Sequence, residues 1–122
     1  VGVGWEWNGS SWVWRGNSSV SPTEDYKFGF YDSKSRKWDE IAFNAPNYLI
    51  VQAAANNRGD GPGSGPAEKD GGDDGYDCIV PEGIAKNVMT VGAVKEIWDY
   101  SDPSDVKMSS FSGWGPCDDG RI

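Results

Sequence analysis

The run Tyr48-Leu49-Ile50-Val51 most constrains the fold, because four consecutive apolar or aromatic residues show no alternation with polar ones. A strand of this kind is buried on both faces, as in a parallel sheet covered by other elements on each side. NVMTVGAV, residues 87–94, has the same character and predicts a second buried strand. VKMSSFS, residues 106–112, is a third strand candidate. These segments predict a parallel sheet.

The segment SKSRKWDEIAFNAP, residues 33–46, predicts a helix ahead of the first strand. Its apolar side chains recur every three to four residues and would form one stripe on the helix. Pro46 ends the helix, because the residue before a proline is driven out of the α region. Helix and strands together indicate an α/β fold in a single unit over residues 1–122. The stripe comprises Trp38, Ile41, Ala42 and Ala45.

Two shorter local patterns precede this helix. In WEWNGSSWVW, four tryptophans alternate with other residues on either side of Asn8-Gly9, a dipeptide favoured in hairpin turns. A four-residue loop, 8–11, would place Trp7 opposite Trp12 and Trp5 opposite Trp14, so that the rings share one face. This face can pack on the domain or can bind a sugar or peptide, and both interpretations stay open. Further on, Ser21, Pro22 and Glu24 form a capping-box pattern that predicts a short helical turn.

Charge and residue types exclude several functions. The net charge of −8 argues against nucleic-acid binding, which requires clustered Lys and Arg. No apolar run approaches the roughly 20 residues that span a bilayer, which argues against a membrane protein. The first four residues lack the features of a signal peptide, so we expect a cytosolic chain or one whose signal has been removed. The chain has no histidine, so it cannot contain a Ser-His-Asp triad by itself.

Ligand-binding patterns in the loops are incomplete. The glycine-rich stretch after Ala55 has no G-x-G-x-x-G and no G-K-[ST], which excludes a phosphate loop. DGGDDGYD, residues 70–77, approaches the spacing of a calcium loop, but Asp70 precedes Asp73 by three residues and the closing glutamate is absent. A solvated acidic turn is the default there, with calcium as the alternative. No other metal site or cofactor is expected. Cys78 and Cys117 fit either two thiols or a bridge, and we predict the disulfide.

The stretch Val51-Gln52-Ala53-Ala54-Ala55 ends in Asn56 and Asn57. An asparagine at the carboxyl end of a parallel strand points its amide into the crevice where α/β sheets bind ligands. Its NH₂ group can donate to the charge that develops on oxygen during acyl transfer. The alternative is a turn asparagine that tolerates a positive φ. Position alone does not decide between them.

Three ordered stretches resemble the subtilisin-like serine peptidases, especially their bacterial branch: LIVQAAANNRGDGP, NVMTVGAV and SSFSGWGPCDDGRI. The resemblance implies part of a parallel-sheet sandwich, with a Trp-rich hairpin and a long Gly/Asp-rich loop added to it. It also implies that Asn56 donates to the oxyanion hole, and that Ala54 and Ala55 line the pocket for the side chain preceding the cleaved bond. A register slip of one residue would give the donor role to Asn57 instead.

The same resemblance implies that the chain is the middle of a catalytic domain. The family carries its Asp and His upstream of the asparagine strand and its Ser downstream in a Gly-Thr-Ser motif, none of which this chain contains. We therefore expect a fragment of a secreted or cell-envelope endopeptidase, inactive alone, whose partners are a peptide substrate and the rest of the domain. One residue departs from the family pattern, because Ala55 stands where glycine is usual.

Overall fold

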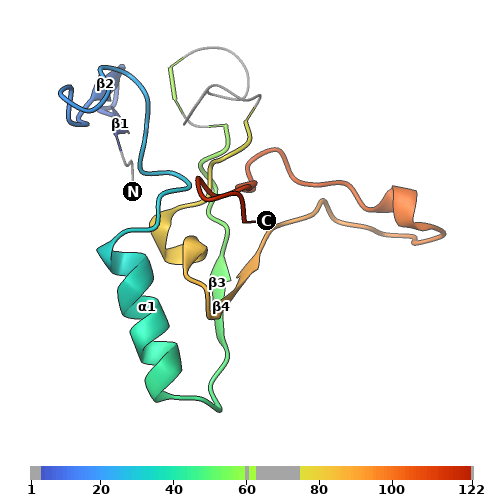
Figure 1. The fold of residues 1–122 in the computed structure, drawn as a ribbon. Helices are drawn as coiled ribbons and strands as arrows, with labels where there is room; N and C mark the ends of the chain where they lie inside the picture. The colour runs from blue at the N-terminus through green and yellow to red at the C-terminus, as the bar shows by residue number, and fades with distance from the viewer. Residues whose placement is uncertain (1–3, 60, 63–74, 122) are drawn as a thin grey trace.

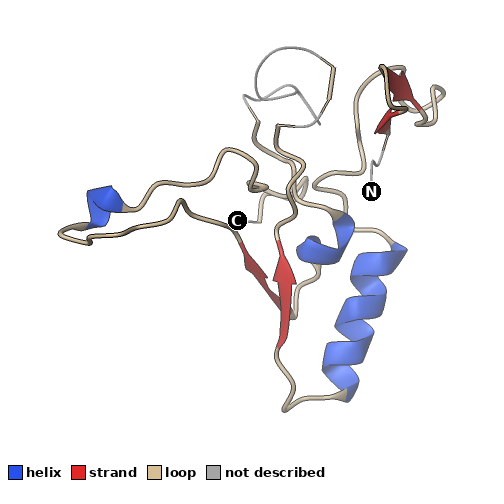
Figure 2. Ribbon diagram, turned by 180° about the vertical axis from the view of Figure 1, so that it is seen from behind, coloured by secondary structure: helices blue, strands red, loops and turns tan. Residues whose placement is uncertain are grey.

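The structure is a computed structural model that describes residues 4–59, 61–62 and 75–121 (Figure 1). The described residues contain one α-helix, which lies beside a parallel pair of strands (Figure 2). A separate hairpin lies near the N-terminus. The architecture is therefore broadly α/β, as predicted. The elements are β1 (Trp5–Trp7), β2 (Trp12–Trp14), α1 (Ser33–Asn44), β3 (Ile50–Ala53), η1 (Pro81–Ile84), β4 (Val88–Val91) and η2 (Pro103–Asp105).

Both apolar runs form strands as predicted, β3 and β4, and these two strands pair in parallel. Ile50 lies opposite Val88, and Ala53 lies opposite Val91. Strand β3 begins at Ile50, two residues later than the expected start at Tyr48. The reason is that the N–H of Tyr48 donates to the carbonyl of Ala45 at 2.9 Å and completes the turn after the helix.

One face of this sheet is covered and the other is open. The hydroxyl of Thr90 donates to the carbonyl of Gly83 at 2.5 Å, which places η1 over the face that also carries Ile50. On the opposite face Val51 is 61% exposed and Met89 is 51% exposed. The prediction of burial on both faces is therefore wrong for the described residues. They supply one covering layer, whereas parallel sheets in globular domains usually have two.

Helix α1 forms as predicted, and its N-terminus is fixed by a capping box. The Asp32 carboxylate accepts from the N–H groups of Lys34 and Ser35, at 2.7 and 3.2 Å. The Ser35 hydroxyl is fully buried and donates to the carbonyl of Pro81 at 2.5 Å, which joins the helix to η1. The buried helix face is centred on Ser35 and Ala42, while Ile41 of the predicted stripe is exposed.

Two further element predictions are wrong. Ser21 does cap its turn, since its hydroxyl accepts from the N–H of Glu24 at 2.9 Å, but no helix follows in residues 21–28. Residues 106–112 form one antiparallel bridge, Val94 to Met108, and not a strand. The chain leaves the sheet at Gly92, so residues 93–95 pair with 107–109 outside it.

The tryptophan hairpin has the predicted register. Trp5 lies opposite Trp14 and Trp7 opposite Trp12, with ring centroids 5.2 and 5.7 Å apart. The buried carboxylate of Asp25 accepts from the N–H groups of Gly4 and Trp5, which ties the hairpin to the following segment. Among the described residues, no helix is long and apolar enough to cross a membrane.

Candidate functional site

The predicted site residues leave the sheet at the carboxyl end of β3. The N–H of Ala54 donates to the carbonyl of Val91 at 2.9 Å, which extends the pairing with β4 by one residue. On the other side, the N–H of Gly113 donates to the carbonyl of Ala55 at 3.1 Å. Ala54 is 3% exposed. The backbone just before Asn56 is therefore held by two segments that are distant in sequence.

Gly113 approaches this strand end so closely that a side chain does not fit. A Cβ built on Gly113 would lie 2.2 Å from the carbonyl oxygen of Ala54 and 3.0 Å from that of Cys78. Contacts below 3.0 Å force the backbone to shift. The SGWG segment of the third family-like stretch thus packs directly on the alanines of the first.

The chain turns sharply at Ala55, whose φ of 68° lies in the left-handed region. Asn56 has no positive φ, so it is not the turn asparagine of the alternative interpretation. Asn56 is exposed, and its carboxamide makes no hydrogen bond to any part of the chain that the structure describes. An amide placed this way can donate to an external oxygen.

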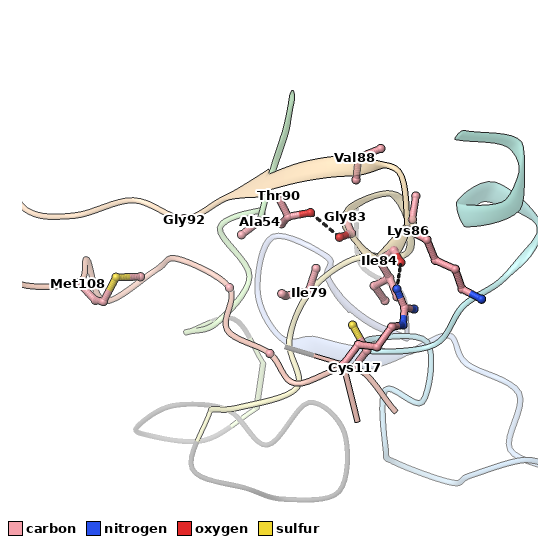
Figure 3. A pocket seen from close by; sticks show the side chains of 14 residues that line it. Ala54, Ile79, Gly83, Ile84, Lys86, Val88, Thr90, Gly92, Met108 and Cys117 are labelled. Carbon is pink, nitrogen blue, oxygen red and sulfur yellow. Dashed lines mark hydrogen bonds between the residues drawn. The ribbon is translucent and has the colours of Figure 1, made fainter. Parts of the chain in front are cut away.

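A hollow of about 610 Å³ lies beneath the same strand end (Figure 3). Ala54 contributes to its wall, whereas Ala55 and Asn56 do not. Thr90 and Met108 also line it, so it extends below the covered face of the sheet and not toward the exposed amide. Of the three predicted site residues, the structure brings Ala54 alone to this hollow.

The predicted disulfide between Cys78 and Cys117 is wrong, because both residues are thiols. The buried sulfur of Cys78 accepts from the N–H of Trp114 at 3.1 Å and its S–H donates to the carbonyl of Gly75 at 3.1 Å. These backbone contacts hold it in place within the core. Burial raises the pKa of the Cys117 thiol, opposed by the Arg121 guanidinium and reinforced by the Asp119 carboxylate, so it is a poor nucleophile at neutral pH.

Residues 4–59, 61–62 and 75–121 contain no group of three acidic or thiol side chains placed to hold a metal ion. Most of the acidic stretch 70–77, the calcium alternative, lies outside the described residues.

Sequence reasoning missed two side chains beside the site, Arg58 and Trp114. The Arg58 guanidinium carbon lies 3.7 Å from the centroid of the Trp114 ring. Residues this far apart in sequence leave no local pattern. The one available signal was the occurrence of both within stretches that resemble the same family.

Comparisons of this chain with protein-family models, with curated proteins and with solved structures give no match. The candidate function therefore depends on the geometry of the strand end and on the three stretches of sequence.

Proposed function

We propose that this chain forms part of the catalytic domain of a subtilisin-like serine endopeptidase, in which the Asn56 carboxamide stabilises the oxyanion. The observation that carries the proposal is an exposed amide, with no hydrogen bond to the described residues, at the carboxyl end of a parallel strand. Ligands of open α/β sheets bind at this edge. By the same resemblance, Ala54 and Ala55 would line the adjoining wall of the substrate cleft.

In this role the amide acts while the peptide carbonyl is attacked. The carbonyl oxygen becomes negative in the tetrahedral intermediate, and the Asn56 NH₂ group donates a hydrogen bond to it. A donor whose position is fixed beforehand stabilises that charge without reorganising during the reaction. The turn at Ala55 directs the chain out of the sheet immediately before the donor.

The nucleophile and the base come from polypeptide beyond these 122 residues, since the chain has no histidine. Ser112 does not serve as nucleophile, because it is 1% exposed and its hydroxyl accepts from the N–H of Ala93 at 3.0 Å. The partners are a peptide or protein substrate and the remaining segments of the domain. No cofactor enters this role, and the enzyme would act as a secreted or cell-envelope protein.

The proposal is tested by steady-state kinetics of Asn56→Ala in the intact peptidase. We expect kcat to fall about 10²–10³-fold, the magnitude known for removing one oxyanion donor from a peptidase of the resembled family, with KM nearly unchanged. Asn47→Ala, in the exposed turn before β3, is the matched control and should leave both constants unchanged. Asn57→Ala tests the register. A large loss of kcat in Asn57→Ala with none in Asn56→Ala would reassign the donor, and a rise in KM alone would refute the role.

A second candidate function is carbohydrate or peptide binding by the hairpin, favoured by Trp7, which is 53% exposed. The inner pair instead packs within the chain, since the Trp5 indole donates to the carbonyl of Thr23 at 2.7 Å and Trp14 contacts Gly4 and Gly16. The exposed ring of Trp7 would be the surface that a ligand contacts. Saturable quenching of tryptophan fluorescence by a glycan, abolished in Trp7→Ala, would support this function.

A further inference from the structure

We propose that Arg58 is a positioning residue for Asn56, acting by fixing the turn that carries the donor amide. The inference rests on the proposed function of Asn56. Arg58 follows Asn56 by two residues, and it contacts two other segments of the chain. Its contacts with the described residues are to Phe111, Gly75 and Trp114, so we place its action on the turn and not on the substrate.

Arg58 contacts other segments through both its backbone and its side chain. Its N–H donates to the carbonyl of Phe111 at 3.3 Å. Its Nε donates to the carbonyl of Gly75 at 3.2 Å, and its guanidinium lies over the Trp114 ring. Tyr76 packs against the same ring, with centroids 5.1 Å apart. The turn after Asn56 is therefore attached to residues 75–76 and to residues 111–114.

The segment 111–114 also fixes the other side of the donor. Gly113 holds the carbonyl of Ala55, one residue before Asn56, while Phe111 and Trp114 hold Arg58, two residues after it. The donor thus lies between two attachments to the same loop, residues 111–114. Such support is needed, because a displacement of about 1 Å at a reacting group can cost about a hundredfold in rate.

The chemistry of these contacts requires arginine. A planar guanidinium stacks on an indole while its Nε donates in the same plane. A lysine ammonium retains the charge over the ring, but it cannot make the planar stack and the Nε bond together. Arg58→Lys is accordingly expected to lie between the wild type and Arg58→Ala.

The test measures kcat and KM of Arg58→Ala, Asn56→Ala and the double variant in the intact peptidase. Loss of positioning should lower kcat of Arg58→Ala about ten- to a hundredfold with KM within about twofold. Because Arg58 acts through the Asn56 amide, it should cause no further loss of kcat in the Asn56→Ala background. Arg36→Ala removes an exposed arginine paired with Glu40 and is the control that should change neither constant.

Each outcome decides the inference. An additive effect in the double variant, or a wild-type kcat in Arg58→Ala, would overturn the positioning role. A wild-type kcat in Asn56→Ala would instead overturn the proposed function, and the two failures are thereby distinguished. If Arg58→Ala does not fold, Arg58→Lys and Trp114→Phe provide the same comparison, since both weaken the stack and keep the backbone bonds. Equal kcat in these two variants and in the wild type would refute the inference.

Discussion

Replacing Ala55 with glycine should stabilise the protein, although it removes a methyl group. The φ of 68° at Ala55 costs an L-residue about 1–2 kcal/mol, a cost that glycine does not have. Glycine also lowers the stability by about 0.4–1 kcal/mol, because it increases the conformational entropy of the unfolded chain. The half-buried methyl contributes about 0.4 kcal/mol, half the value of a fully buried CH₂ group. The net gain is about 0.5 kcal/mol.

The matched control is Ala53→Gly, two residues earlier on the same chain. Ala53 belongs to β3 and has no positive φ, so the same change there should destabilise by about 0.5–1 kcal/mol. Urea unfolding followed by circular dichroism gives both free energies. We expect opposite signs and a difference of about 1–1.5 kcal/mol between the variants. Equal destabilisation by both glycines would refute the left-handed turn. The same turn accounts for the glycine that is usual at this position in the resembled family.

Two further predictions concern the attachment of α1. Ser35→Ala leaves the buried carbonyl of Pro81 without its donor and removes half of the capping box, and should cost about 2 kcal/mol, whereas exposed Ser33→Ala should cost little in the same urea assay. Asp39 is partly buried, which raises its pKa, but hydrogen bonds from Tyr31 and Asn87 outweigh this and hold the pKa below its ordinary value of 3.8. The stabilisation is present above pH 3.8 and is lost as the pH falls through the lowered pKa. The advantage of the wild type over Asp39→Asn should therefore shrink from pH 6 to pH 3, and a constant difference would contradict this.

Local periodicity predicted the elements whose structure is decided by near neighbours. The hairpin register follows from alternating tryptophans around Asn8-Gly9, and the helix follows from its apolar spacing and Pro46. The two apolar runs predicted the two strands of the parallel pair, although not that they are neighbours. Where the strands begin and bend was not predictable, because it depends on bonds such as that of Tyr48 to Ala45 and on the departure of the chain at Gly92.

The candidate site shows the same division. The strand-end rule pointed to the asparagines that follow β3, and the choice of Asn56 over Asn57 came from the family resemblance. The alternative of a turn asparagine needs a positive φ, which Asn56 does not have. The disulfide prediction failed because sequence does not reveal that the loop carbonyl and N–H groups around Cys78 already hold its sulfur. Arg58 and Trp114 meet only through the tertiary structure. Contacts between segments that are distant in sequence are therefore harder to predict than a local strand-end pattern.

The affinity of a peptide aldehyde measures the oxyanion role of Asn56 most directly, because its hemiacetal with the nucleophile places a tetrahedral oxygen where the donor amide acts. In the intact peptidase, Asn56→Ala should weaken aldehyde binding by about 10²-fold or more while KM for the matching peptide substrate stays nearly constant. Equal affinity of wild type and variant for the aldehyde would contradict the assignment of Asn56 as an oxyanion donor.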